Sequence, residues 1–156
     1  MRPGDEITAT LAAIVRLCVE SPDVSAELAG MGGGEPLEHV YADRVPPRDA
    51  PPPWLVLVPS ETRDTLRMGA GERFMAKVPV AVKLITVGES TLAGGRLLQA
   101  VYAAIQGNQN LRLEVPELGD AVTVLTAHRT GTFRYPERAD GVEYRHSGAY
   151  FDVIVQ

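Results

Sequence analysis

The sequence predicts an α+β fold, with one mostly antiparallel sheet of four to five strands and two main helices. Three observations lead to this prediction. Residues 77–106 join an alternating apolar strand to an amphipathic helix, residues 54–58 form a continuous apolar run of strand length, and residues 121–155 have the pattern of a β-hairpin. A chain of 156 residues buries roughly 70% of its unfolded surface. We therefore expect residues 1–156 to form one domain.

The N-terminal part predicts an amphipathic helix over Asp5–Glu20. Its apolar stripe places Cys18, the single cysteine, in the core as an inert thiol, and one cysteine excludes an internal disulfide framework. A second, short helix is expected over Asp23–Ala29. Gly30–Gly34 is then a flexible break rather than a phosphate loop, because Glu35 stands where the fingerprint needs a third glycine. The apolar stripe consists of Ile7, Leu11, Ile14, Val15 and Cys18.

The middle of the chain predicts two strands on either side of a proline-rich arm. Leu37–Val45 has the aromatic and β-branched content of a strand, and residues 46–53 then contain five prolines, which cannot donate ladder hydrogen bonds. We interpret this arm either as a shield for a sheet edge or as a contact with a partner. Trp54–Val58 should be a central strand that pairs with the strand at 77–87. Residues 60–73 are polar and too long for a tight hairpin, so we expect a long surface loop.

The strand at 77–87 is apolar on both faces, and Ser90 is placed to cap the helix that follows it. Gly94 and Gly95 each cost a helix roughly 1 kcal/mol relative to alanine. Either the regular helix begins near Arg96, or close packing against the sheet requires the small size of the two glycines. The apolar strand residues are Val78, Val80, Val82 and Leu84 on one face and Ala81, Ile85 and Val87 on the other, and the helical stripe is Leu98, Val101, Tyr102 and Ile105.

The C-terminal part predicts a short strand over Leu111–Val115, followed by a hairpin of Ala121–Tyr135 and Val142–Val155. Its connection, Pro136–Gly141, ends in an Asp-Gly pair that favours a turn. The register expected from this connection places Tyr135 opposite Val142.

Composition and charge exclude several classes of protein. The net charge of −5 and the pI near 5.2 argue against a surface that grips nucleic acid, which requires clustered Lys and Arg. The N-terminal apolar run is interrupted by Arg16 and does not resemble a secretory signal. No segment approaches the ~18 apolar residues of a membrane span. We expect a soluble protein that is cytosolic when made and has no membrane partner.

No set of residues forms a catalytic constellation, so we expect no enzyme activity, no cofactor and no metal. His39, His128 and His146 lack a metal-ligand spacing such as HxxxH, and the expected register keeps the last two apart. No GxSxG elbow surrounds Ser147. Three carboxylates near Pro116 are expected to be solvated rather than paired in a cleft: Glu114, Glu117 and Asp120.

Charged residues gather on the last hairpin and on the long loop. They form either a solvated surface or ion pairs between subunits, because mixed charges suit the rim of an interface. The hairpin carries Arg129, Arg134, Arg138 and Arg145, and the loop carries Glu61, Arg63, Asp64, Arg67 and Glu72.

Three predicted strands are apolar or half apolar on both faces, yet only two substantial helices are available to cover them. Either one helix covers each face within a monomer, or another copy of the chain covers the second face. A head-to-tail contact that closes by rotation gives a ring.

The order of elements resembles the tail-terminator, or tail-completion, proteins of long-tailed (siphovirus-like) bacteriophages. The resemblance covers most of the chain. It rests on the N-terminal amphipathic helix, on "HVYADRVPPRDAPPPWLVLV", on "AKVPVAVKLITVGESTLAGGRLLQAVYAAIQG" after a variable loop, and on the closing strand "YRHSGAYFDVIV".

The resemblance implies a structural virion protein: a homo-hexameric ring at the head-proximal end of the tail tube, which ends tube polymerisation and joins tail to head. It implies a fold related to that of tube proteins, and partners in the tail tube protein, a head-completion or stopper protein, and genomic DNA that passes without specific binding. Its location would be the tail or neck of the virion, after assembly in the host cytoplasm. The expected interface residues are Arg44, Pro46, Pro47, Pro51, Trp54, Glu61, Arg63, Asp64, Arg67, Glu72, Arg134 and Arg138.

Two other functions stay open. The chain would also suit another neck component, a stopper or an adaptor, because such rings have similar sizes and surfaces. From a different class, a small cytosolic ligand-binding or enzymatic α+β dimer would need a pocket with converging polar groups, and the sequence reveals no such convergence.

Overall fold

The computed structural model describes residues 6–60, 63–68, 73–88, 91–106, 109–115 and 120–156. Within these residues the chain forms three α-helices, one short 3-10 helix and seven strands. The helices are α1 (Glu6–Val19), α2 (Pro22–Gly30), η1 (Pro36–His39) and α3 (Thr91–Gln106). The strands are β1 (Val40–Ala42), β2 (Trp54–Pro59), β3 (Arg63–Met68), β4 (Arg73–Val87), β5 (Leu111–Val115), β6 (Asp120–Ala139) and β7 (Val142–Val155).

The strands form one sheet in the order β1-β2-β4-β7-β6-β5, with β3 paired to the first part of β4. Every pair is antiparallel except β1 with β2, which is parallel. The predicted α+β class and the mostly antiparallel sheet are therefore confirmed. The expected pairing of residues 54–58 with the strand at 77–87 is also confirmed, since β2 lies between β1 and β4.

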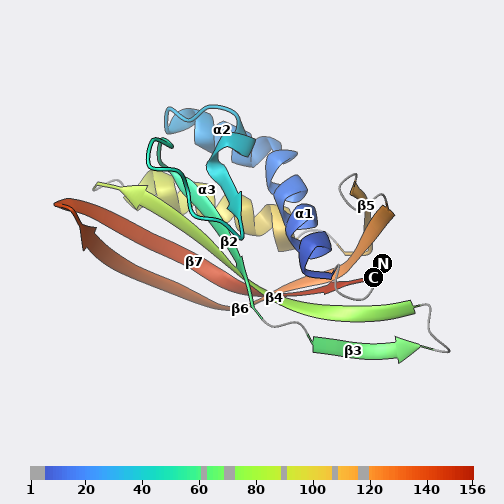
Figure 1. Ribbon diagram of the computed structural model, residues 1–156. Helices are drawn as coiled ribbons and strands as arrows, with labels where there is room; N and C mark the ends of the chain where they lie inside the picture. The colour runs from blue at the N-terminus through green and yellow to red at the C-terminus, as the bar shows by residue number, and fades with distance from the viewer. Residues whose placement is uncertain (1–5, 61–62, 69–72, 89–90, 107–108, 116–119) are drawn as a thin grey trace.

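All three helices lie on one face of the sheet (Figure 1). The core lies between the helices α1 and α3 and the alternating inward residues of the central strands β4 and β7. Val82 of β4 and Phe151 of β7 are both 0% exposed. The sequence left open whether one helix covers each face of the sheet or another copy of the chain covers the second face. For the described residues, one helix on each face is excluded. None of the helices described is long and apolar enough to cross a membrane.

The N-terminal helix forms as the sequence predicts. Cys18 is buried in the core, and burial raises the pKa of its thiol to about 12. Arg16 donates to the carbonyl oxygen of Glu114 and thereby ties α1 to β5. The second helix, α2, is one residue longer at each end than expected, and Ser21 caps it by accepting a hydrogen bond from the Val24 N–H.

The segment after α2 only partly follows the prediction. The strand expected over Leu37–Val45 is limited to β1, because its first residues form η1. The His39 ring causes this arrangement: its Nε2 accepts from the Gly34 N–H at 3.1 Å, and its Nδ1 lies 2.9 Å from the Pro53 carbonyl oxygen. The buried imidazole thus connects the glycine-rich turn to the end of the proline-rich arm.

The proline-rich arm, residues 46–53, is held by its own chain. Trp54 donates from its indole N–H to the Ala50 carbonyl at 3.1 Å. Just before the arm, the Arg44 guanidinium lies 5.2 Å from the centre of the Tyr41 ring, and Asp43 N–H donates to Leu57 O at 2.9 Å. These contacts favour the interpretation that the arm covers the β1–β2 end of the sheet, and contact with a partner remains a prediction.

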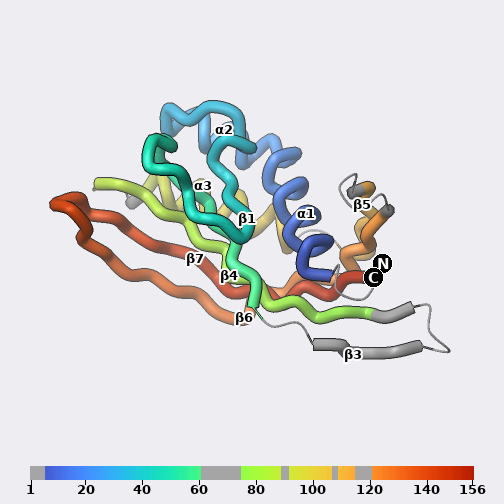
Figure 2. The backbone as a smooth tube through the Cα atoms, in the orientation of Figure 1, coloured from blue at the N-terminus to red at the C-terminus, as the bar shows by residue number. Residues whose placement is uncertain are grey.

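The prediction of a long loop over residues 60–73 is wrong for residues 63–68 and for Arg73, with which β4 begins, and residues 61–62 and 69–72 lie outside the described residues. Residues 63–68 are β3, which pairs antiparallel with the first residues of β4, from Arg63 opposite Lys77 to Met68 opposite Arg73. The two strands form a hairpin that projects beyond the core (Figure 1), and the tip of the β6–β7 hairpin lies at the opposite end of the sheet (Figure 2). The sequence of β3, "RDTLRM", lacks the apolar alternation by which strands are predicted.

The last hairpin is longer than expected, and its predicted register is wrong by four residues. Tyr135 faces His146 rather than Val142, because the turn consists only of Asp140 and Gly141, whose φ values are +50° and +77°. Pro136 therefore lies within β6. Beyond Val124 the side of β6 that faces away from β7 has no neighbouring strand among the described residues, so the missing proline N–H costs no ladder bond.

The two glycines of α3 lie inside the helix, which begins at Thr91 rather than near Arg96. A Cβ at Gly94 would lie 3.4 Å from Cγ2 of Thr86, so this glycine is in close contact with the sheet. A Cβ at Gly95 would meet nothing within 4 Å. The packing explanation therefore holds for Gly94 and fails for Gly95. The predicted cap, Ser90, lies outside the described residues.

Candidate interaction surfaces

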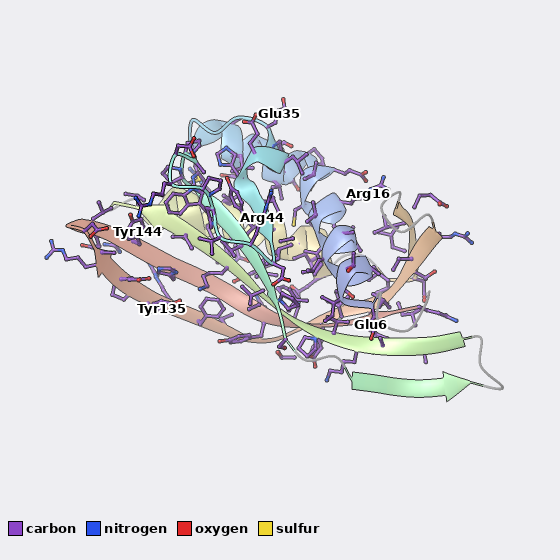
Figure 3. The ribbon with its side chains drawn as sticks, viewed as in Figure 1. Glu6, Arg16, Glu35, Arg44, Tyr135 and Tyr144 are labelled. Carbon is purple, nitrogen blue, oxygen red and sulfur yellow. The ribbon has the colours of Figure 1, made fainter. Side chains whose placement is uncertain are left out.

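The face of the sheet opposite the helices carries a row of aromatic side chains. The registers of β2, β4, β6 and β7 bring them together from three strands, β2, β6 and β7. Figure 3 shows that Tyr135 and Tyr144 lie along the projecting β6–β7 hairpin. We call this surface the outer aromatic face, and it consists of Trp54, Phe133, Tyr135, Tyr144, His146 and Tyr150.

The rings of the outer aromatic face contact one another. Tyr135 stacks on His146 with ring centres 4.6 Å apart and an interplanar angle of 7°. Phe133 lies 5.1 Å from Tyr150 and 6.2 Å from Tyr135, and Trp54 lies 6.0 Å from Tyr144. Such pairs contribute roughly 0.5–1.5 kcal/mol each beyond their burial. The rings therefore form two contacting groups rather than separate exposed side chains: Tyr150, Phe133, Tyr135 and His146 in one, and Trp54 and Tyr144 in the other.

A glycine allows the rings to lie this close to the sheet. Gly148 faces Phe133 across the β6–β7 pair, and a Cβ added to it would lie 2.6 Å from Phe133 Cζ and closer still to the Val82 carbonyl oxygen. The phenyl ring thus occupies the space in which any other residue at position 148 would place its side chain.

Three charged or titratable groups lie among the rings. Lys83 Nζ is 3.2 Å from the Tyr135 hydroxyl, and His146 Nε2 is 2.8 Å from a carboxylate oxygen of Glu137, close enough for an ion pair but without hydrogen-bond geometry. Burial lowers the pKa of His146, as does the Lys83 ammonium, and the Glu137 carboxylate opposes both. The folded state therefore disfavours the protonated form of His146 relative to an ordinary histidine.

The outer aromatic face remains exposed in the described residues. Tyr150 is 51% exposed and Tyr135 is 42% exposed, with Val58 and Val87 also exposed beside them. Single exposed apolar residues are ordinary, but a contiguous group of large ones marks an interaction surface. This face is the first candidate site.

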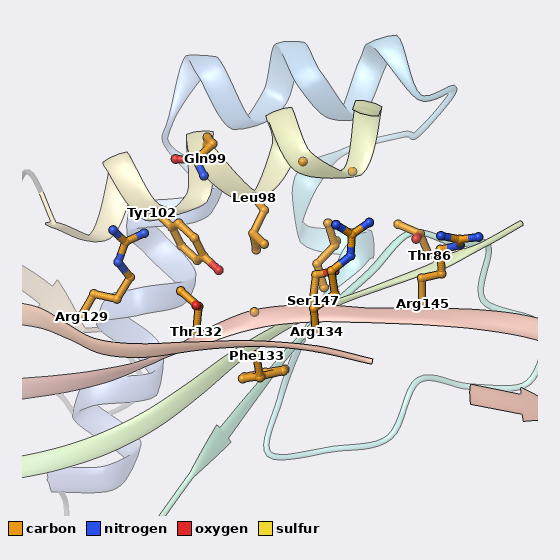
Figure 4. Close-up of a pocket in the computed structure, with 14 residues that line it drawn as sticks. Thr86, Leu98, Gln99, Tyr102, Arg129, Thr132, Phe133, Arg134, Arg145 and Ser147 are labelled. Carbon is orange, nitrogen blue, oxygen red and sulfur yellow. The ribbon is translucent and has the colours of Figure 1, made fainter. Parts of the chain in front are cut away.

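The second candidate site is a pocket between α3 and the β6–β7 hairpin, on the helix-facing side of the sheet (Figure 4). Its volume is about 330 Å³. Along β6 the residues on this side change from buried apolar side chains, such as Val124 and Ala127, to Arg129 and Arg134. Figure 4 shows both arginines rising toward α3 and Phe133 pointing to the opposite side. We call this the arginine pocket.

Three arginines line the arginine pocket. The Arg129 guanidinium lies 5.1 Å from the centre of the Tyr102 ring, and Arg145 donates to Gly88 O at 3.1 Å and to a Glu143 carboxylate oxygen at 3.2 Å. Burial raises the pKa of the Tyr102 hydroxyl, and the Arg129 charge opposes this shift. Arg134 has no ion pair with any described residue. The described residues that line the pocket include no carboxylate.

The residues predicted as an interface do not gather on one surface. Trp54 belongs to the outer aromatic face, Arg134 to the arginine pocket, and Arg138 lies near the hairpin tip opposite Glu143. The others lie on three further segments. Arg44 is beside the arm, Pro46, Pro47 and Pro51 are in it, Arg63, Asp64 and Arg67 are on β3, and Glu61 and Glu72 lie outside the described residues.

Neither surface is predicted as a whole from the sequence. The aromatic residues of β6 and β7 were visible, but the register that was wrong by four residues separated Tyr135 from His146. The convergence of Arg129 with Arg134 and Arg145 was also missed, since Arg129 shares their side of the sheet only because of the bulge between Arg129 and Gly131 in β6. A turn placed at Asp140–Gly141 would have recovered the stacking of Tyr135 on His146.

No protein-family model matches the chain, and no curated protein matches its sequence. Among solved structures, the fold is similar to that of a chain from the "Virion of native gene transfer agent (GTA) particle", with a TM-score of 0.63. The two chains are 15% identical, and the similarity covers 96% of each. At this level of identity the similarity establishes a shared fold over nearly the whole chain.

Proposed function

We propose that the chain is a virion structural protein that forms a ring at the head-proximal end of a phage tail tube, where it ends tube polymerisation and joins tail to head. The observation that carries the proposal is the outer aromatic face, which the helices of the chain leave uncovered. A virion chain with the same fold over 96% of both sequences supports a virion component, as does the sequence resemblance to tail terminators.

A ring needs two different surfaces on each copy, and the two sides of the sheet supply them. Two outer aromatic faces packed on each other would give a twofold pair, whereas a neighbour that covers this face with a different surface makes a head-to-tail contact. Closure by rotation then gives a ring, for which the resemblance implies six copies. The net charge of −5 suits a conduit for DNA, since an acidic lumen does not hold phosphates.

The proposal is tested by the mass of the assembly. Native mass spectrometry or light scattering of the chain, alone and on assembled tail tubes, should give a six-subunit ring in at least one state. Tyr150→Asp should weaken the ring, because a central interface aromatic contributes about 2 kcal/mol or more, which is roughly 30-fold in affinity.

Leu92→Asp is the matched control. Leu92 lies on α3, on the helix-covered side of the sheet, and is 73% exposed. The Leu92→Asp variant therefore replaces an exposed apolar side chain that lies away from the outer aromatic face. The control should assemble like the parent chain. A parent chain that never exceeds a dimer, or a Tyr150→Asp ring as stable as the parent ring, would refute the proposal.

The same purified chain and tail tubes distinguish the proposed function from two alternative functions. A stopper or adaptor would assemble on the head side and leave tail tubes of uncontrolled length, so the length of tubes grown with and without the chain distinguishes it from a terminator. The arginine pocket is the one observation that favours a ligand-binding protein. A stable dimer that retains a small metabolite through native mass spectrometry would support that function instead.

A further inference from the structure

We propose that the arginine pocket is a docking site for an acidic, extended peptide segment of a partner protein, whose carboxylates pair with Arg129 and Arg134. This inference does not depend on the ring. It rests on the charges that line the pocket, on a glycine that keeps it open, and on the edge of β6 through which a peptide would enter.

Two of the three arginines that line the arginine pocket, Arg129 and Arg134, have no carboxylate partner among the described residues. Some cations elsewhere in the described chain are paired: Lys77 pairs with Asp152 at 2.5 Å, and Arg96 with Glu27 at 3.5 Å. In the pocket only Arg145 contacts a carboxylate. A chain with 20 acidic and 15 basic residues has enough carboxylates to neutralise every cation, so two arginines without one are suited to an external anion.

A glycine keeps the pocket open. Gly95 lines it from the α3 side, and a Cβ there would meet nothing within 4 Å, so packing does not require glycine. Glycine in a helix interior costs roughly 1 kcal/mol relative to alanine. We infer that the absence of a side chain at this position preserves space for a ligand.

Neutral hydrogen-bond donors complete a site for carboxylates. The Thr132 and Ser147 hydroxyls and the Gln99 amide line the pocket beside the arginines. Guanidinium groups bind carboxylates through two parallel hydrogen bonds, which fixes orientation as well as charge. A volume of about 330 Å³ accommodates a few side chains and is at the small end for ligand sites.

The open edge of β6 favours a peptide over other acidic ligands. Beyond Val124 this edge has no neighbouring strand in the part of the chain that the structure describes, so an extended segment can lie beside Arg129 and Arg134. DNA would need a row of cations to displace its counterions, and three arginines line this pocket of an acidic chain. Carboxylate is therefore the anion that the site favours.

The test uses the full chain and a fluorescein-labelled peptide of eight glutamates, with a peptide of eight glutamines as the neutral probe. Fluorescence anisotropy should show salt-sensitive binding of the glutamate peptide only. Arg134→Glu should weaken binding at least about tenfold, and Arg134→Lys should retain part of it. Gly95→Leu should weaken it as well, because a side chain would fill the pocket.

Arg138→Glu is the matched control. It makes the same charge reversal on the same hairpin, but Arg138 does not line the pocket. Binding should change less than about twofold. Circular dichroism and thermal unfolding would establish that the variants fold, which is expected because Arg134 is exposed.

Three outcomes would overturn the inference. The first is equal weakening by Arg134→Glu and Arg138→Glu, which indicates non-specific attraction. The second is tighter binding of a single-stranded oligonucleotide at the same arginines, and the third is binding of citrate with no binding of the peptide. A ring that assembles normally without binding the peptide would refute the docking site and leave the proposed function intact.

Discussion

Two substitutions of glycine by alanine should change stability in opposite directions. At Gly148 the added Cβ would lie 2.6 Å from Phe133 Cζ, 3.1 Å from Lys83 Cα and closer still to the Val82 carbonyl oxygen. Two of these three neighbours are backbone atoms, which cannot move without separating β4 from β7. Overpacking of this kind costs about 1–3 kcal/mol, occasionally more. We expect Gly148→Ala to destabilise the chain by about 3 kcal/mol, because the contacts with backbone place it at the upper end of that range.

Gly95→Ala makes the same chemical change where nothing lies within 4 Å, so it should stabilise α3 by roughly 1 kcal/mol. Gly131→Ala is intermediate, since its Cβ would touch only Tyr150 Cδ2 at 3.8 Å. Urea unfolding followed by circular dichroism, at one fixed protein concentration, gives the three free energies. The reasoning is refuted if Gly148→Ala is as stable as the parent chain, or if the changes at positions 148 and 95 have the same sign.

Two further predictions concern titratable groups. Because burial raises the pKa of Cys18 to about 12, the folded chain should resist alkylation by iodoacetamide at pH 8, and the chain in concentrated urea should react; equal rates in both states would contradict its burial. The folded state holds the pKa of His146 below its ordinary value of 6.5, so the unfolded state binds the proton more readily. Stability should accordingly be constant above about pH 6.5 and fall as the pH is lowered through the folded pKa, and His146→Gln should flatten this fall in urea unfolding curves. A fall of the same size in the variant would assign it to other groups.

The central part of the fold is predictable because its buried strand positions are occupied by apolar residues. Residues 54–58 and 77–87 are apolar wherever they touch the core, and the pairing of β2 with β4 follows from that pattern. The projecting parts are less predictable. The strand β3 lacks the apolar alternation of a buried strand, and Pro136 belongs to a strand whose open edge tolerates it, so neither follows the usual signals.

The candidate surfaces depend on register and are therefore harder to predict than the fold. A shift of even one residue moves a side chain to the other face of a sheet, and each bulge in β6 introduces such a shift. The role of Arg134 illustrates this. Its presence on the hairpin is evident from sequence, but its convergence with Arg129 requires the position of the bulge between Arg129 and Gly131.

Beyond the helices the β6–β7 ribbon is a single layer, so its two sides are separated only by the backbone (Figure 1). Arg134 and Tyr135 are consecutive residues that point to opposite sides, one to the arginine pocket and the other to the outer aromatic face. A ligand that twists the ribbon from one side must therefore reorient the rings on the other. If binding at one surface changes the affinity of the other, thermodynamic linkage requires the reverse effect by the same factor.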